Sequence, residues 1–131
     1  MQKKILIVDD DHGILLVLSE LMKSPHLVVV QCDTAAKAKK ALSESAFDLV
    51  ITDVRLTGKN CLAGLDLLDH VRLESPLTEV IIMTGDGTDE IKERVQRQKA
   101  YFFEKSSELS HLLCIVQILG IMDPGPCCED A

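Results

Sequence analysis

Several carboxylates, one hydroxyl and one ammonium group in this chain stand at or just beyond the end of short apolar stretches. The set comprises Asp9-Asp10-Asp11, Asp53, Thr84 and Lys105. Carboxylates that lie close together repel one another unless a cation neutralises them, and a ligand set made only of oxygen suits Mg²⁺. A carboxylate can also act as a nucleophile, while a hydroxyl and an ammonium can hold the oxygens of a phosphoryl group. If these residues meet in space, they predict a Mg²⁺-dependent site that forms an aspartyl phosphate.

Five apolar segments that suit buried strands precede or separate these residues. They are Ile5–Val8, Leu27–Val30, Phe47 with Leu49–Thr52, Val80–Met83 and Tyr101–Phe103. Continuous apolar runs that alternate with helical patterns are typical of a parallel sheet with helices on both faces. Right-handed crossovers then bring the carboxyl end of every strand to one edge. The acidic residues, Thr84 and Lys105 are therefore expected to meet at that edge.

The five helical patterns are defined by apolar residues at helical spacing and by polar caps. The expected inward faces are Ile14, Val17, Leu18 and Leu21; Ala35, Ala38 and Leu42; Leu65, Leu67, Leu68 and Val71; Ile91 and Val95; and Leu109, Leu112, Leu113, Val116 and Leu119. Asp33 or Thr34 is expected to cap the second helix, and Ser106 or Ser107 the fifth. The fourth helix, from about Thr88 to Gln98, has the fewest apolar residues and is expected to be mostly exposed. Residues 1–122 are expected to form one domain, followed by a disordered tail over 123–131.

The composition argues against several classes of partner. The formal net charge is −7 at pH 7 and aromatic residues make up 3%, so there is no basic stripe or stacking surface for nucleic acid. No apolar run is long enough to span a membrane, and the apolar part of the N-terminus is too short for a signal peptide. Five scattered cysteines fit reduced thiols. These features predict a cytoplasmic protein without direct contact to nucleic acid or membrane.

Four separated motifs resemble the receiver domain of two-component response regulators. They are Ile5 to Asp11, Phe47 to Asp53, Val80 to Gly85, and Glu104-Lys105, in the order found in that family. The resemblance extends over roughly residues 3 to 121. It implies an α/β, flavodoxin-like three-layer fold with a five-stranded parallel sheet of order 2-1-3-4-5 and five helices.

The resemblance also implies a role for each acidic residue. Asp53 corresponds to the phosphoacceptor, which takes a phosphoryl group from a histidine kinase or a histidine phosphotransfer protein. Asp10 would ligate Mg²⁺ directly, Asp9 through water, and Arg55 by its backbone carbonyl, with Asp53 completing the metal site. The protein would phosphorylate and dephosphorylate itself at Asp53 without turning over an external substrate.

The remaining motif residues would transmit the signal. Thr84 would move toward the phosphoryl group, Lys105 would pair with it, and Phe102 matches the aromatic switch position. Phosphorylation would then change the face formed by the fourth helix, fifth strand and fifth helix. The expected partners are the phosphodonor and a downstream protein or effector domain, and a phosphorylation-dependent dimer is left open.

The chain departs from the family pattern in three places. The loop after Asp53 lacks the usual proline, and Gly64 arrives later than usual. Ser106 stands where a proline normally follows the lysine, and the stretch before Phe102 is shorter than usual. These departures affect the placement of Lys105, the switch and kinase docking.

Two alternatives remain open at this point. One is a degenerate receiver that binds partners without being phosphorylated, which Ser106 and the altered loop favour. The other is an aspartyl-phosphate phosphatase of the haloacid dehalogenase type. That class requires Asp-x-Asp at the nucleophile, whereas Asp53 is followed by Val54 and Arg55, so the general acid is missing.

Overall fold

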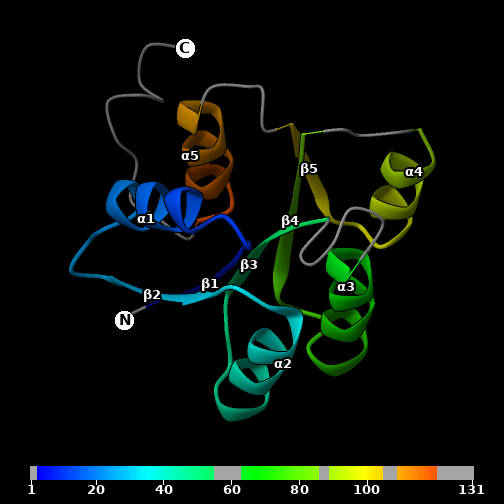
Figure 1. The fold of residues 1–131 in the computed structure, drawn as a ribbon, viewed down its shortest axis with the longest axis horizontal. Helices are drawn as coiled ribbons and strands as arrows, with labels where there is room; N and C mark the ends of the chain where they lie inside the picture. Colours follow the sequence, from blue (N-terminus) through cyan, green and yellow to red (C-terminus); the bar gives the residue numbers. More distant parts are fainter. Residues whose placement is uncertain (1–2, 55–62, 86–88, 105–108, 121–131) are drawn as a thin grey trace.

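The fold contains one sheet of five parallel strands (Figure 1). A computed structural model of the chain describes residues 3–54, 63–85, 89–104 and 109–120, and, within the last range, not the side chain of Leu109. The strands are β1 (Lys3–Val8), β2 (Leu27–Cys32), β3 (Leu49–Asp53), β4 (Glu79–Thr84) and β5 (Tyr101–Glu104). Their order is β2-β1-β3-β4-β5, which confirms the predicted flavodoxin-like topology. Phe47 lies before β3 and not within it, which corrects the predicted start of that strand.

The strands are paired so that the candidate residues come to the same edge. Asp53 pairs with Met83 at the end of β3, and Thr84 pairs with Glu104 at the end of β4. On the other side of β3, Val8 pairs with Thr52. Asp9 and Asp53 are the next residues along the chain after the two members of this pair. Register alone therefore aligns the ends of β1, β3 and β4.

Helices cover both faces of the sheet. They are α1 (His12–Leu21), α2 (Ala35–Glu44), α3 (Ala63–Glu74), α4 (Asp89–Arg97) and α5 (Leu109–Ile118). In Figure 1, α1 and α5 lie on one side and α2, α3 and α4 on the other. Alternate residues of β1 show why both faces are apolar: Ile5 and Ile7 pack in the core with α1 and α5, and Leu6 and Val8 in the core with α2, α3 and α4.

The apolar stripe that α1 turns to the sheet differs from the predicted one. Leu15, Leu18 and Met22 are buried, whereas Val17 and Leu21 are exposed. Every position from Ile14 to Leu18 is apolar, so the spacing does not select one stripe. Packing against the sheet selects it, and the prediction for Val17 and Leu21 was wrong.

The other helices agree more closely with their patterns. In α4 only Ile91 and Val95 are buried, as predicted. Thr34, and not Asp33, caps α2, because its hydroxyl accepts a hydrogen bond from the backbone N–H of Lys37 at 3.2 Å. The predicted caps Ser106 and Ser107 and the predicted tail over 123–131 lie outside the described residues. Within the described ranges, no helix has both the length and the apolar character needed to cross a bilayer.

Candidate functional site

Three carboxylates meet where β1 and β3 end. Each of Asp9, Asp10 and Asp53 offers one oxygen, and these oxygens all lie within 4.8 Å of one another. Asp9 and Asp53 are buried, while Asp10 is exposed. The arrangement gives a partly enclosed acidic site with one open side.

Asp9 is oriented by the first turn of α1. Its Oδ1 accepts a hydrogen bond from the backbone N–H of Asp11 at 2.9 Å, and its own N–H donates to the carbonyl of Cys32 at 3.1 Å. The Asp11 carboxylate in turn accepts from the backbone N–H of Gly13 at 2.9 Å and caps the helix. No separate role was predicted for Asp11 from the sequence. The signal for it was present, since an aspartate just before a helical pattern is a common cap.

Asp53 is positioned by a close approach of the backbone. The N–H of Val54 donates to the Met83 carbonyl at 3.0 Å, and the N–H of Gly64 donates to the Val54 carbonyl at 2.9 Å. A Cβ at position 64 would lie 1.9 Å from the carbonyl oxygen of Asp53, far closer than van der Waals contact allows. Only glycine fits there. Although Gly64 comes later in the sequence than the family pattern has it, it packs directly against the backbone of Asp53.

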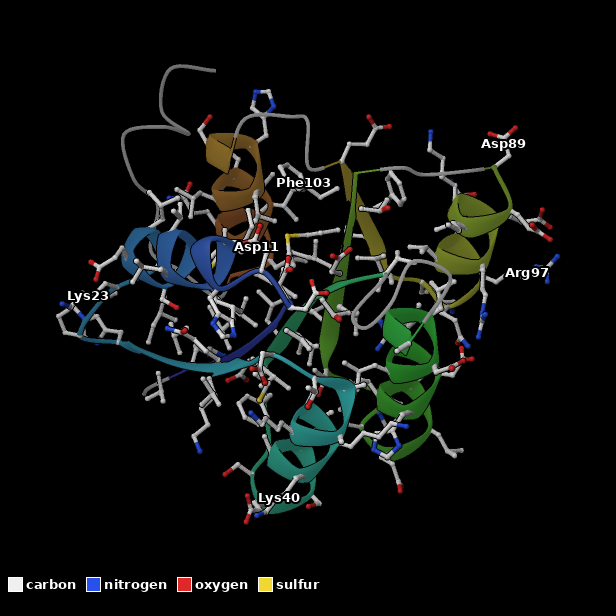
Figure 2. All side chains as sticks on the ribbon, viewed as in Figure 1. Asp11, Lys23, Lys40, Asp89, Arg97 and Phe103 are labelled. Atoms are coloured by element: carbon white, nitrogen blue, oxygen red, sulfur yellow. The ribbon has the colours of Figure 1, made fainter. Side chains whose placement is uncertain are left out.

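Thr84 and Phe102 lie on the next two strands beyond Asp53. Thr84 is buried at the end of β4, one residue beyond the partner of Asp53. Phe102 is half-buried against the core on the side of α2, α3 and α4, and the ammonium of Lys92 on α4 is 5.5 Å from the centre of its ring. Its neighbour Phe103 is buried on the side covered by α1 and α5 (Figure 2). The two adjacent aromatic residues therefore face opposite sides of the sheet.

The sequence predicts a role in or beside the site for three further residues. Arg55, Lys105 and Ser106 lie outside the described residues. The same holds for most of the loop between Asp53 and Gly64.

A separate polar cluster stands at the end of β2. Asp33 pairs with Lys37 at 2.9 Å and with His12 at 3.1 Å. The hydrogen bond from Lys37, followed by that from His12, lowers the pKa of Asp33 below its ordinary value. Burial raises the pKa of the neighbouring Cys32 thiol. Asp33 is thus paired with Lys37 and hydrogen-bonded to the His12 ring.

The donor set at the acidic site fits a small hard cation. All three groups are carboxylates, their oxygens are close enough to share one ion, and Asp10 is exposed. Without a cation the three negative charges repel one another. The residues present are therefore suited to Mg²⁺.

Comparison with known proteins gives one consistent family. A family model described as "Response regulator receiver domain" matches residues 5–117. The chain is 32% identical to response regulator protein FleR of Pseudomonas aeruginosa over 96% of its own length, and covers 28% of that protein. It is 28% identical to sporulation initiation phosphotransferase F of Bacillus subtilis, with 86% of the chain and 89% of that protein covered. It covers 18% to 23% of three further relatives, which like FleR are much longer.

The fold agrees with solved structures. The non-phosphorylated HemR receiver domain of Leptospira biflexa superposes with a TM-score of 0.80 at 25% identity. That match covers 95% of this chain and 99% of the HemR domain. The similarity extends over the whole sheet and its helices.

Proposed function

This chain belongs to the family of response regulator receiver domains, and from that premise we propose that it is a phosphorylation switch with Asp53 as its phosphoacceptor. Receiver domains are signalling domains of two-component systems and are not enzymes that turn over a substrate. The observation that carries the proposal is the cluster of Asp9, Asp10 and Asp53 at the carboxyl edge of the sheet. Ligands bind at this edge in open α/β sheets.

The proposed reaction is a transfer from phosphohistidine to Asp53. A carboxylate oxygen of Asp53 attacks phosphorus, a P–O bond forms, the P–N bond breaks, and the departing imidazole nitrogen takes up a proton. Asp10 would hold Mg²⁺ directly and Asp9 through water, with Asp53 and the Arg55 carbonyl completing the set. Bound Mg²⁺ supplies neutralisation of the phosphoryl charge. The hydrogen bond from the Asp11 N–H supports this by keeping Asp9 turned toward the site.

The proposed output is a change on the face formed by α4, β5 and α5. Thr84 and Lys105 would hold the phosphoryl oxygens, and Phe102 would move to a more buried position as Thr84 shifts. The small apolar anchor of α4 supports this, because an element that moves must have low local stability. The phosphodonor would be a histidine kinase or a histidine phosphotransfer protein. The recipient would be a downstream protein or an effector domain, and residues 1–122 would form the switching unit in the cytoplasm.

The test is phosphorylation by a small-molecule donor. The chain is incubated with acetyl phosphate and Mg²⁺, and its intact mass is measured. We expect the mass gain of one phosphoryl group, and we expect no gain for Asp53→Asn or after removal of Mg²⁺ by a chelator. A gain that persists in Asp53→Asn would refute Asp53 as the acceptor.

Two other outcomes would favour the alternatives. No mass gain in the wild-type chain would favour a receiver that binds partners without phosphorylation. Continued release of inorganic phosphate from an added phosphate ester would instead favour a phosphatase.

A further inference from the structure

Helix α4 contacts the rest of the fold through charged groups as well as apolar ones. Of its side chains only Ile91 and Val95 are buried. Two aliphatic side chains are a weak apolar anchor for a helix that must keep one position in the resting state. The polar contacts of α4 with its neighbours therefore add to what holds it in place.

One carboxylate of α3 binds two side chains from α4 and the turn after it. The Asp69 Oδ2 accepts a hydrogen bond from the Arg94 guanidinium at 2.5 Å, and its Oδ1 accepts from the Gln98 amide at 2.6 Å. Asp66, one turn earlier on α3, lies 3.5 Å from the same guanidinium. The hydrogen bond with Asp69 raises the pKa of Arg94 above its ordinary value. Both oxygens of Asp69 are thus engaged in holding α4 against α3.

Arg72, one turn after Asp69 on α3, makes further hydrogen bonds between α3 and its neighbours. Its Nε donates to the Gln98 carbonyl at 2.6 Å, and its Nη1 donates to the Thr78 carbonyl at 2.5 Å. These bonds join α3 to the turn after α4 and to the start of β4. They are made to backbone carbonyls and do not involve the side chain of Asp69.

We propose that Asp69 is a positioning residue of the switch, holding α4 in its resting place and opposing its movement when Asp53 is phosphorylated. This inference rests on the proposed function. A contact made in one of two states stabilises that state and lowers the population of the other. The side chains of Asp69 and Arg94 are 43% and 39% exposed, so water and salt weaken the contact. Asp69 therefore shifts the populations of the two states modestly and does not prevent the movement of α4.

The test combines helix mobility with binding of a phosphoryl analogue. In Asp69→Asn, which keeps the shape and removes the charge, we expect faster amide hydrogen exchange across α4 in the resting protein. We expect the affinity for beryllofluoride, in the presence of Mg²⁺, to rise about two- to fivefold. High salt is expected to reduce the difference from wild type. A damaged fold would lower the affinity, so an increase separates a role in switching from a loss of structure.

Glu93→Gln is the matched control. Glu93 pairs with Arg97 at 2.5 Å, and this pair lies within α4. Figure 2 shows Arg97 pointing away from the body of the protein. This variant is expected to leave α4 exchange and beryllofluoride affinity near wild-type values. Arg94→Gln is expected to act in the same direction as Asp69→Asn, and the double variant to add little to Arg94→Gln, because both variants remove the Asp69–Arg94 ion pair.

The outcomes separate this inference from the proposed function. A wild-type protein that binds no beryllofluoride would overturn the proposed function. Normal binding by the wild type, with equal affinities for Asp69→Asn and Glu93→Gln, would overturn only the role of Asp69. Unchanged amide hydrogen exchange across α4 in Asp69→Asn would also overturn the role of Asp69 and leave the proposed function intact.

Discussion

At the scale of single residues, the acidic site depends on a glycine that carries no chemistry. The backbone at Gly64 approaches the carbonyl of Asp53 so closely that a Cβ would lie 1.9 Å from it. Asp53 can take its position at the end of β3 only because position 64 has no side chain. The altered length of the preceding loop therefore does not remove the backbone contact between Gly64 and Asp53.

Gly64→Ala is expected to destabilise the protein and to disturb the site together. Relief of the overlap must move backbone atoms, so we expect a loss of at least about 2 kcal/mol in the free energy of unfolding. We also expect slower phosphorylation by acetyl phosphate in the folded fraction, since Asp53 is displaced. Urea unfolding and intact-mass kinetics measure the two effects.

Gly85→Ala is the control for this prediction. A Cβ at position 85 would meet no atom within 4 Å. The free energy of unfolding is expected to change by less than about 0.5 kcal/mol. Equal stabilities of the two variants would show that the close approach at Gly64 is not a constraint.

At the scale of elements, α1 shows how packing resolves an ambiguous pattern. Leu18 is fully buried against the sheet, whereas Leu16, two residues earlier, is 61% exposed. Both residues belong to the same apolar run. The position of α1 bears on the acidic site, since Asp11, which caps the helix, donates its backbone N–H to Asp9.

A pair of identical substitutions on α1 tests this orientation. Leu18→Ala is expected to lower the free energy of unfolding by about 2–5 kcal/mol, because it leaves a cavity in the core. Leu16→Ala is expected to change it by about 0.5 kcal/mol or less. Thermal or urea unfolding measures both, and a larger loss for Leu16→Ala would mean that α1 is rotated about its axis.

At the scale of the whole molecule, the acidic site is expected to couple stability to metal binding. The chain carries a formal charge of −7, and three of its carboxylates gather within 4.8 Å at one edge. Folding brings Asp53 next to Asp9 and Asp10, and repulsion among the three carboxylates opposes folding. A cation that binds only the folded state stabilises it increasingly as its concentration rises.

Mg²⁺ and the removal of one charge are therefore expected to act in the same direction on the melting temperature. At ten times its dissociation constant, Mg²⁺ is expected to stabilise the wild-type protein by about 1.4 kcal/mol. Asp10→Asn is expected to melt above the wild type without Mg²⁺ and to respond much less when it is added. Scanning calorimetry with and without Mg²⁺ measures both. A full Mg²⁺ response in Asp10→Asn would remove Asp10 from the metal site.

Much of the architecture was predictable because its physical causes are local. Each strand contains an apolar run, and right-handed crossovers make the carboxyl ends of parallel strands coincide. That rule alone predicts that Asp9, Asp10 and Asp53 meet at one edge, and their oxygens do lie within 4.8 Å of one another. The roles of Arg55 and Lys105 stay predictions, since both lie outside the described residues.

The sequence by itself determined the fold class, the strand order implied by the family motifs, and the acidic edge, because these follow from residue type and spacing along the chain. Only the tertiary structure decided which stripe of α1 faces the core, why position 64 must be glycine, and that Asp69 binds Arg94 and Gln98. These three features depend on residues brought together from separate elements. Their geometry is set by how helices pack on the sheet, which no local pattern specifies.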